Sequence, residues 1–108
     1  MLQSIKGQPG SQGIAKGVAR VILSLDELNR FKQGEILVTS VTSPSWTPVI
    51  HSASAVVTDI GGSLSHAAIV CREYGIPAVV GTKVGTKTIK DSQLVEVNGT
   101  TGTISILG

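Results

Sequence analysis

His66 follows a short segment rich in glycine and serine, in which the five preceding positions include Gly61, Gly62, Ser63 and Ser65. A neutral imidazole has a lone pair that can attack phosphorus, whereas a protonated imidazole does not. Glycine-rich turns present backbone N–H groups to phosphate oxygens, and serine hydroxyls add further donors. These residue types at this spacing predict that His66 carries a phosphoryl group and that the four residues before it bind the phosphate.

The sequence on either side predicts how His66 is positioned. Residues 55–57 form a short apolar run typical of a buried strand, and helix formers continue from residue 67 to residue 74. Ser63 and Ser65 are both candidate N-caps for that helix. The positive end of the helix dipole favours an anion, and also a neutral imidazole, beside it. A lone histidine at a helix start can equally be a capping or packing residue, so this segment alone leaves that alternative open.

Longer stretches of the sequence resemble a known family. Residues 61–70 (GGSLSHAAIV) and 72–81 (REYGIPAVVG) resemble the phosphohistidine motif of the PEP-utilising enzyme mobile domain. That family includes pyruvate phosphate dikinase, phosphoenolpyruvate synthase, the first enzyme of the sugar phosphotransferase system and rifampicin phosphotransferase. The likeness covers most of the chain, through residues 13–20, 34–38, 42–48 and 95–102. In this resemblance His66 matches the phosphorylated histidine, and a motif of this length is far more specific than a lone glycine pattern.

Three positions depart from the family pattern. Leu64 stands where many members carry a threonine, which is a regulatory phosphorylation site in plant-type dikinases. Because leucine cannot be phosphorylated, that mode of control is not carried over, and the comparison leans towards the synthase-like and antibiotic-phosphotransferase-like branches. Cys71 replaces a common alanine, and Ser92 replaces a common glycine.

The resemblance implies an α/β fold, namely the compact swivelling β/β/α domain, with about six or seven short strands and one principal helix starting near His66. It also implies a phosphoryl-carrier function. By this resemblance, an ATP-grasp-like nucleotide-binding domain is expected to phosphorylate His66 from ATP, and the carrier is then expected to swing to an acceptor-binding domain. Magnesium and ATP are expected on the partner domain, and no metal or other cofactor in this one, because the sequence has no carboxylate cluster. Such a domain is part of a phosphotransferase and is not catalytically complete alone.

Three functions remain open at this point. The chain is a carrier within a phosphotransferase, a stand-alone regulatory or partner-binding module that keeps the fold without turnover, or a structural domain whose histidine is inert. The intact His66, with its glycines and serines, argues against the third. The first two differ in whether His66 turns over when a partner is added.

Length and composition bound these alternatives. A chain of 108 residues suits one domain and is too small to hold an ATP site, a swivel and an acceptor site together. The net charge of +2 is too small to indicate a nucleic-acid or membrane-surface partner, and no apolar stretch approaches the length of a membrane span. The single cysteine agrees with a reducing cytoplasm. Residues 1–13 are expected to be a flexible lead-in or linker remnant, and residues 14–108 a single phosphohistidine swivelling domain.

Sequence patterns also predict the remaining elements. Strands are expected over residues 17–23, 35–39, 78–80, 86–89, 94–97 and 103–106. Short helices are expected over residues 26–31, with Ser24 as N-cap, and from Pro48 to about residue 53. The dipeptide Asn98-Gly99 predicts a hairpin turn between the last two strands.

Four further side chains are assigned structural roles. Trp46 is expected to be a packing anchor in a loop near the histidine, and His51 a surface residue. Cys71 is expected to be a small buried hydrophobe. Arg72 lies two turns into the helix, where we expect a structural ion pair rather than a contact with phosphate.

Overall fold

The computed structural model describes residues 3–108 and forms eight strands with short helices between them. The strands are β1 (Gln3–Lys6), β2 (Gln8–Ser11), β3 (Ile14–Val21), β4 (Ile36–Thr39), β5 (Ala55–Thr58), β6 (Ala78–Val80), β7 (Leu94–Asn98) and β8 (Thr103–Ile106). The α-helices are α1 (Thr47–Ser52), α2 (His66–Tyr74) and α3 (Gly85–Thr88), and the 3₁₀ helices are η1 (Leu25–Arg30) and η2 (Pro44–Trp46).

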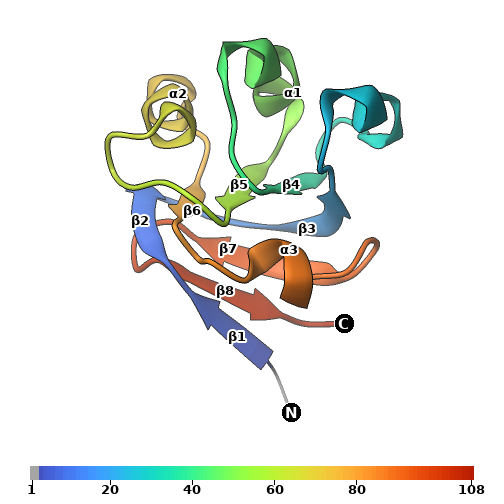
Figure 1. Cartoon of the computed structure of the whole chain (residues 1–108). Helices are drawn as coiled ribbons and strands as arrows, with labels where there is room; N and C mark the ends of the chain where they lie inside the picture. Colours follow the sequence, from blue (N-terminus) through green and yellow to red (C-terminus); the bar gives the residue numbers. More distant parts are fainter. Residues whose placement is uncertain (1–2) are drawn as a thin grey trace.

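The strands follow the order β1-β8-β7-β3-β4-β5-β6-β2 and fold into two facing sheets (Figure 1). Strands β3 to β6 are parallel, and the other pairs are antiparallel. β3 belongs to both sheets, because residues 14–18 pair with β7 and residues 19–21 pair with β4. The connections over residues 22–35, 40–54 and 59–77 contain the helices η1, η2, α1 and α2 and carry the chain back from one parallel strand to the next, as parallel pairing requires.

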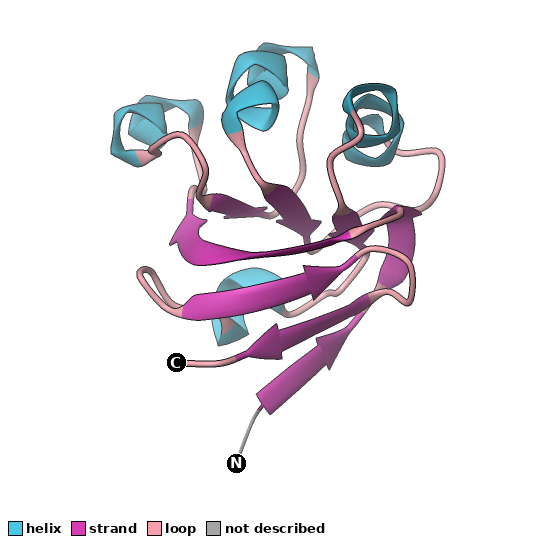
Figure 2. Ribbon diagram, turned by 180° about the vertical axis from the view of Figure 1, so that it is seen from behind, coloured by secondary structure: helices cyan, strands magenta, loops and turns pink. Residues whose placement is uncertain are grey.

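Two apolar cores hold three layers together. One core lies between the two sheets and is built from small β-branched and aliphatic residues, including Val57, Val79 and Val97. The other lies between the parallel sheet and the helices α1 and α2, and contains Trp46, Ile50 and Cys71. Figure 2 shows the helical layer on one side of the stacked strands. The predicted β/β/α arrangement and its single principal helix, α2, are therefore confirmed, although the strands number eight rather than six or seven.

The flexible lead-in predicted for residues 1–13 is wrong for residues 3–11, which form β1 and β2; residues 1 and 2 lie outside the described part of the chain. β1 pairs with β8 and β2 pairs with β6, so both strands form their ladders with segments far away in the sequence. Ile5 is buried in the core between the sheets. Tertiary pairing and this burial offset the low strand propensity of glycine and proline in the segment.

A second correction concerns residues 86–89, where a strand was expected and the helix α3 is found. Thr86 donates its backbone N–H and its hydroxyl to the Asp59 carboxylate, at 2.9 and 2.5 Å. Gly85 N–H donates to Thr82 Oγ1 at 3.0 Å. These side chains satisfy backbone donors at the start of a helical turn, which stabilises a helix where local composition favours a strand.

The other expected elements are confirmed, with shifts of a few residues at their ends. Ser24 caps η1, because its hydroxyl accepts from Asp26 N–H at 3.2 Å. The β7–β8 hairpin also forms, but its loop spans residues 99–102 instead of two residues. The Asn98 carboxamide oxygen stabilises the longer loop by accepting from the N–H groups of Thr100 and Thr101, each at 3.0 Å.

Candidate functional site

The segments that follow β4, β5 and β6 meet at one edge of the parallel sheet. Parallel strands end at the same edge, and in open α/β sheets ligands bind at the carboxyl ends of the strands. Backbone bonds continue beyond the strands: Ile60 N–H donates to the Ser40 carbonyl at 2.9 Å, and Lys83 N–H donates to the Asp59 carbonyl at 2.9 Å. The segment after β5 is therefore held on both sides, and it leads directly into α2.

His66 is the first residue of α2 and is half-buried. Its Nδ1 lies 2.8 Å from Oγ1 of Thr42, a buried residue in the segment after β4. Among residues 3–108, the structure records this one hydrogen bond for the His66 ring. If Nδ1 carries the proton and donates to Thr42, Nε2 keeps the lone pair and is the nucleophilic nitrogen. The site thus contains one oriented imidazole at the start of a nine-residue helix.

Sequence reasoning did not select Thr42 as a site residue. It predicted only that the loop over residues 42–48 lies near the histidine, and the Thr42–His66 bond confirms that proximity. Thr42 and His66 are 24 positions apart in the chain. They meet because β4 and β5 are parallel neighbours in register from Ile36↔Ala55 to Thr39↔Thr58. A polar residue just after a buried strand, next to the strand that leads to the histidine, was the available signal.

The two glycines before His66 have different structural requirements. Gly61 has φ +128°, and a Cβ placed on it would lie 2.9 Å from the Ser65 side chain. An L side chain rarely adopts that backbone conformation, so the turn requires glycine there. Gly62 needs no positive φ, and a Cβ on it would lie 3.4 Å from Gln8 Oε1. Of the two glycines, only Gly61 therefore has a backbone conformation that favours glycine.

The two serines also differ from the expected capping pattern. Ser65 occupies the N-cap position of α2, as one of the two alternatives predicted, but its hydroxyl makes no capping bond. Its Oγ donates to the Gly62 carbonyl at 2.7 Å, and Ser65 N–H donates to the same oxygen at 3.0 Å. Ser63 is exposed within this turn and does not cap the helix. The first-turn amides of α2 are therefore not occupied by a serine cap, and such amides attract anions.

The side chains with predicted structural roles are found as follows. Trp46 is buried in the core beneath the helices, which confirms its packing role. His51 is exposed, and its ring contacts Tyr74 edge-on with 3.9 Å between ring centroids. Arg72 makes no ion pair among the described residues; its Nη1 donates to the Gly10 carbonyl at 2.7 Å, so the ion-pair prediction is wrong. Burial raises the pKa of the Cys71 thiol to about 12, as expected for a buried hydrophobe.

Two further features bear on possible functions. Across the described chain, residues 3–108, no three His, Cys, Asp or Glu side chains come together as a metal site. Asp59, the acidic residue that precedes His66 most closely, is bonded to Thr86 as a support for α3. Within the same described residues, no helix is long and apolar enough to cross a membrane.

Comparison with known families and proteins was made for the whole chain. Residues 31–102 match the family model described as "PEP-utilising enzyme, mobile domain". The chain belongs to this family. The chain is 48% identical over 105 residues to a rifampicin phosphotransferase of Bacillus cereus. This match covers 97% of the chain and 12% of that protein. The chain is also 50% identical over 100 residues to a probable phosphoenolpyruvate synthase of Archaeoglobus fulgidus, covering 93% and 13%.

The fold of this mobile domain also occurs elsewhere. The crystal structure of aconitase X from Thermococcus kodakaraensis, in its holo form, matches with a TM-score of 0.75 and covers 98% of this chain and 99% of that one. The sequence identity is 21%, so this likeness concerns the fold alone. The chain spans about an eighth of the length of the phosphotransferase and synthase relatives, which are transferases with further parts beyond a mobile domain.

Proposed function

We propose that this mobile domain is a phosphoryl carrier in which Nε2 of His66 accepts a phosphoryl group and passes it to an acceptor. The observation that carries the proposal is the position of His66 at the start of α2, with Nδ1 bonded to Thr42 at 2.8 Å. We assign the Nδ1 proton to this hydrogen bond, with Thr42 Oγ1 as the acceptor, because that arrangement leaves the lone pair on Nε2 for attack on phosphorus. Family membership supports the same chemistry.

In the proposed step, the Nε2 lone pair forms the N–P bond while the P–O bond to the donor breaks. The electron pair of the broken bond leaves with the donor oxygen. The Nδ1 proton stays on the ring and continues to donate to Thr42 Oγ1, so the positive phosphoimidazolium ring retains a hydrogen-bond acceptor beside it. The amides at the start of α2, together with Gly61, Gly62, Ser63 and Ser65, would stabilise the transferred phosphoryl oxygens.

The nucleotide and its magnesium are assigned to a partner domain, and the acceptor to another. The chain as described has no acidic cluster for the metal, and phosphoryl transfer requires a held nucleotide with its charge neutralised. We therefore expect the chain to be incapable of labelling itself from ATP, at any magnesium concentration. The relatives' activities suggest the class of whole enzyme, a dikinase- or synthase-like phosphotransferase working in the cytoplasm.

The test is a chimera in which this chain replaces the matched 105-residue segment of the Bacillus cereus rifampicin phosphotransferase. Incubation with ATP labelled at the β- or γ-phosphate, followed by mapping of the acid-labile, base-stable phosphate, should place the label on His66. His66→Ala should abolish the label and leave the melting curve nearly unchanged, because a residue at a helix start contributes little packing.

His51→Ala is the matched control, since His51 is the other histidine of the chain and is exposed away from this edge. Its labelling should equal that of the unsubstituted chimera. Base-stable label that persists in the His66→Ala protein would contradict the proposal. So would rapid, stoichiometric self-labelling of the isolated chain.

A further inference from the structure

Gly81 follows β6 directly and lies against the turn that precedes His66. Its backbone has φ +65°, in the left-handed region. A Cβ placed on Gly81 would lie 2.6 Å from the carbonyl oxygen of Gly61 and 3.8 Å from its carbonyl carbon. Real Cβ atoms do not come this close to a backbone oxygen, and a backbone atom cannot rotate aside as the end of a side chain can. The structure therefore leaves no room for a side chain between Gly81 and the Gly61–Gly62 peptide group.

The segment that contains Gly81 is held in place on both sides. Val80, the preceding residue, is a fully buried member of β6. Thr82, the following residue, donates its N–H to the Thr58 carbonyl at 3.0 Å and its hydroxyl to the same oxygen at 3.1 Å. Because these contacts keep Gly81 from moving away, a side chain at this position would have to displace the carbonyl group of Gly61.

Gly61 also lies against the residue that precedes His66. The position that a Cβ of Gly61 would occupy is 2.9 Å from both Cβ and Oγ of Ser65. Ser65 is the N-cap residue of α2 and is bonded to the Gly62 carbonyl through its N–H and its hydroxyl. A series of close contacts thus runs from Gly81 through Gly61 to Ser65. A displacement that begins at Gly81 would therefore reach the start of α2.

The peptide group beside Gly81 also carries the N–H of Gly62. This peptide bond is trans, so its carbonyl and its N–H point in opposite directions. The orientation of the Gly61 carbonyl therefore sets the orientation of the Gly62 N–H. None of the hydrogen bonds recorded among residues 3–108 has this N–H as its donor, and Gly62 is partly exposed. The Gly62 N–H is thus available to an oxygen atom from outside the domain.

We infer that Gly81 is a positioning residue for phosphoryl transfer: its lack of a side chain keeps the Gly61–Gly62 peptide group in the orientation in which the Gly62 N–H donates to the phosphoryl group on His66. This inference rests on the proposed carrier function. Gly81 acts through Gly61 and takes no part in bond making or breaking. A donor that is oriented before the reaction stabilises the charge of the transition state without reorganisation, so a small displacement of that donor lowers the rate.

The test replaces glycine by asparagine in the Bacillus cereus chimera. Asparagine adopts a positive φ more readily than most residues that have a Cβ, so Gly81→Asn adds a Cβ with little change of backbone preference. We expect the single-turnover rate of His66 labelling at saturating ATP to fall about tenfold. The ATP concentration that gives half of that rate should stay unchanged, because the nucleotide is assigned to the partner domain. In the ¹H–¹⁵N spectrum of the 108-residue chain, the amide signal of Gly62 should move.

Gly75→Asn and Gly102→Asn are the matched controls. Gly75 has φ +68°, with nothing within 4 Å of an added Cβ, so this variant tests the backbone conformation alone. Gly102 has φ +79°, and a Cβ there would lie 2.7 Å from the carbonyl oxygen of Gly7, so this variant tests a similar clash in the β7–β8 loop. Both controls should be labelled at the rate of the unsubstituted chimera, whatever the change in their melting temperatures.

The alternative results contradict either the inference or the proposed function. Labelling of Gly81→Asn at the unsubstituted rate would overturn the inference, as would an equal loss in Gly102→Asn; both would leave the carrier function standing. A slow Gly81→Asn protein whose Gly62 amide signal is unshifted, or whose half-saturating ATP concentration rises, would also overturn it. Where Gly81→Asn does not fold, Gly81→Ala takes its place in the same comparison. A folded, unsubstituted chimera that ATP fails to label would overturn the proposed function, and this inference with it.

Discussion

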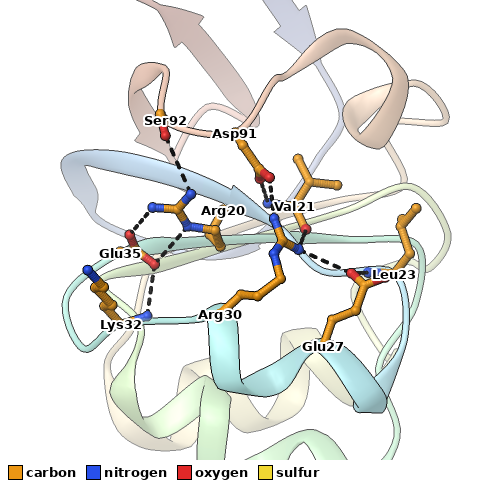
Figure 3. A network of polar contacts seen from close by, with 9 residues as sticks. All are labelled: Arg20, Val21, Leu23, Glu27, Arg30, Lys32, Glu35, Asp91 and Ser92. Carbon is orange, nitrogen blue, oxygen red and sulfur yellow. Dashed lines mark hydrogen bonds and ion pairs between the residues drawn. The ribbon is translucent and has the colours of Figure 1, made fainter.

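Two regions of the domain differ in how far their polar side chains are bonded within the domain. All three ion pairs recorded among residues 3–108 lie around β3, η1 and the turn before β7, the region drawn in Figure 3. Arg20 donates to both carboxylate oxygens of Glu35, at 3.2 and 2.7 Å, and Arg30 bridges Glu27 and Asp91. At the His66 edge, the described residues contribute exposed apolar side chains and an imidazole with a single recorded hydrogen bond.

The comparison shows how stability and function are separated in this fold. The charged side chains of the Arg20–Glu35 region bond to one another, and these bonds join β3 to the segment before β4. The His66 edge keeps bonding capacity and apolar surface available for a group from outside. A substitution in the first region should change the free energy of unfolding, whereas one in the second should change phosphoryl transfer. The following predictions test that separation.

The largest effect is expected from Gly61→Ala. The added Cβ would lie 2.9 Å from the Ser65 side chain at a backbone φ of +128°, so the turn before His66 must shift. We expect labelling of His66 in the chimera to fall about a hundredfold, the scale of a 1 Å misplacement, with a cost of roughly 1–2 kcal/mol in stability.

Gly62→Ala is the matched control for this change. Gly62 has no positive φ and has room for a Cβ, and alanine keeps the backbone N–H that would bind the phosphoryl oxygens. Transfer and melting temperature should therefore both stay close to the unsubstituted values. Equal transfer rates for Gly61→Ala and Gly62→Ala would show that the strained turn has no part in transfer. That result would contradict the assignment of function to the His66 edge.

A smaller loss is expected from Thr42→Val, which keeps the shape of the side chain and removes Oγ1. Without its acceptor, Nδ1–H is no longer favoured, and the imidazole is less well oriented. We expect transfer to fall about tenfold, from the loss of about one hydrogen bond. Nitrogen chemical shifts of the His66 ring should show a changed tautomer balance.

Thr42→Ser provides the rescue, because serine restores the hydroxyl. Its transfer rate and ring shifts should return most of the way to those of the unsubstituted chain. A Thr42→Val protein with normal tautomer shifts but slow transfer would mean that Thr42 acts through packing alone.

On the structural side, Glu35→Gln should lower the free energy of unfolding by about 1–2 kcal/mol and leave labelling unchanged. The effect should depend on pH. The hydrogen bond from Arg20 holds the pKa of Glu35 below its ordinary value of 4.5, so its stabilising contribution is complete above that value and is lost as the pH falls through the lowered pKa. The stability curves of the two proteins should therefore converge in acid.

Glu27→Gln is the matched comparison, because Glu27 pairs with Arg30 at a more exposed position, at 3.2 Å and three residues away along η1. Exposed pairs of this kind contribute only about 0.3–0.5 kcal/mol. Equal losses for the two glutamine variants would show that burial of the Arg20–Glu35 pair has no energetic consequence.

The smallest effect is expected at Cys71. With a pKa of about 12 and a buried side chain, the native thiol should be inert to iodoacetamide at pH 8. Its rate of alkylation should follow the rate of global unfolding measured in denaturant. Fast alkylation of the native protein would reveal local opening of α2, and the edge that carries His66 would then be mobile rather than preformed.

Local sequence signals predicted the centre of the site. A glycine break followed by helix formers was enough to place His66 at the start of α2, because turn and helix formation depend on neighbours in the chain. Thr42 could not be predicted in the same way, since its contact with His66 depends on the parallel pairing of β4 with β5.

The incorrect predictions have the same origin. β1 and β2 read as a linker because their partners, β8 and β6, lie far away in the sequence. α3 read as a strand because the carboxylate that supports it, Asp59, is 27 residues earlier than Thr86. Tertiary contacts overrode local preference in both segments.

The double membership of β3 has a mechanical consequence. Its residues 14–18 are bonded into one sheet and residues 19–21 into the other, without a break in the strand. A force that pulls the two sheets apart therefore acts on the continuous backbone of β3 and on its hydrogen bonds to both β7 and β4. The domain should yield in one step rather than sheet by sheet, and amide protons in the middle of β3 should exchange with deuterium only through complete unfolding. In the proposed carrier function, this construction would keep the internal geometry of the domain unchanged while the domain moves between its partners.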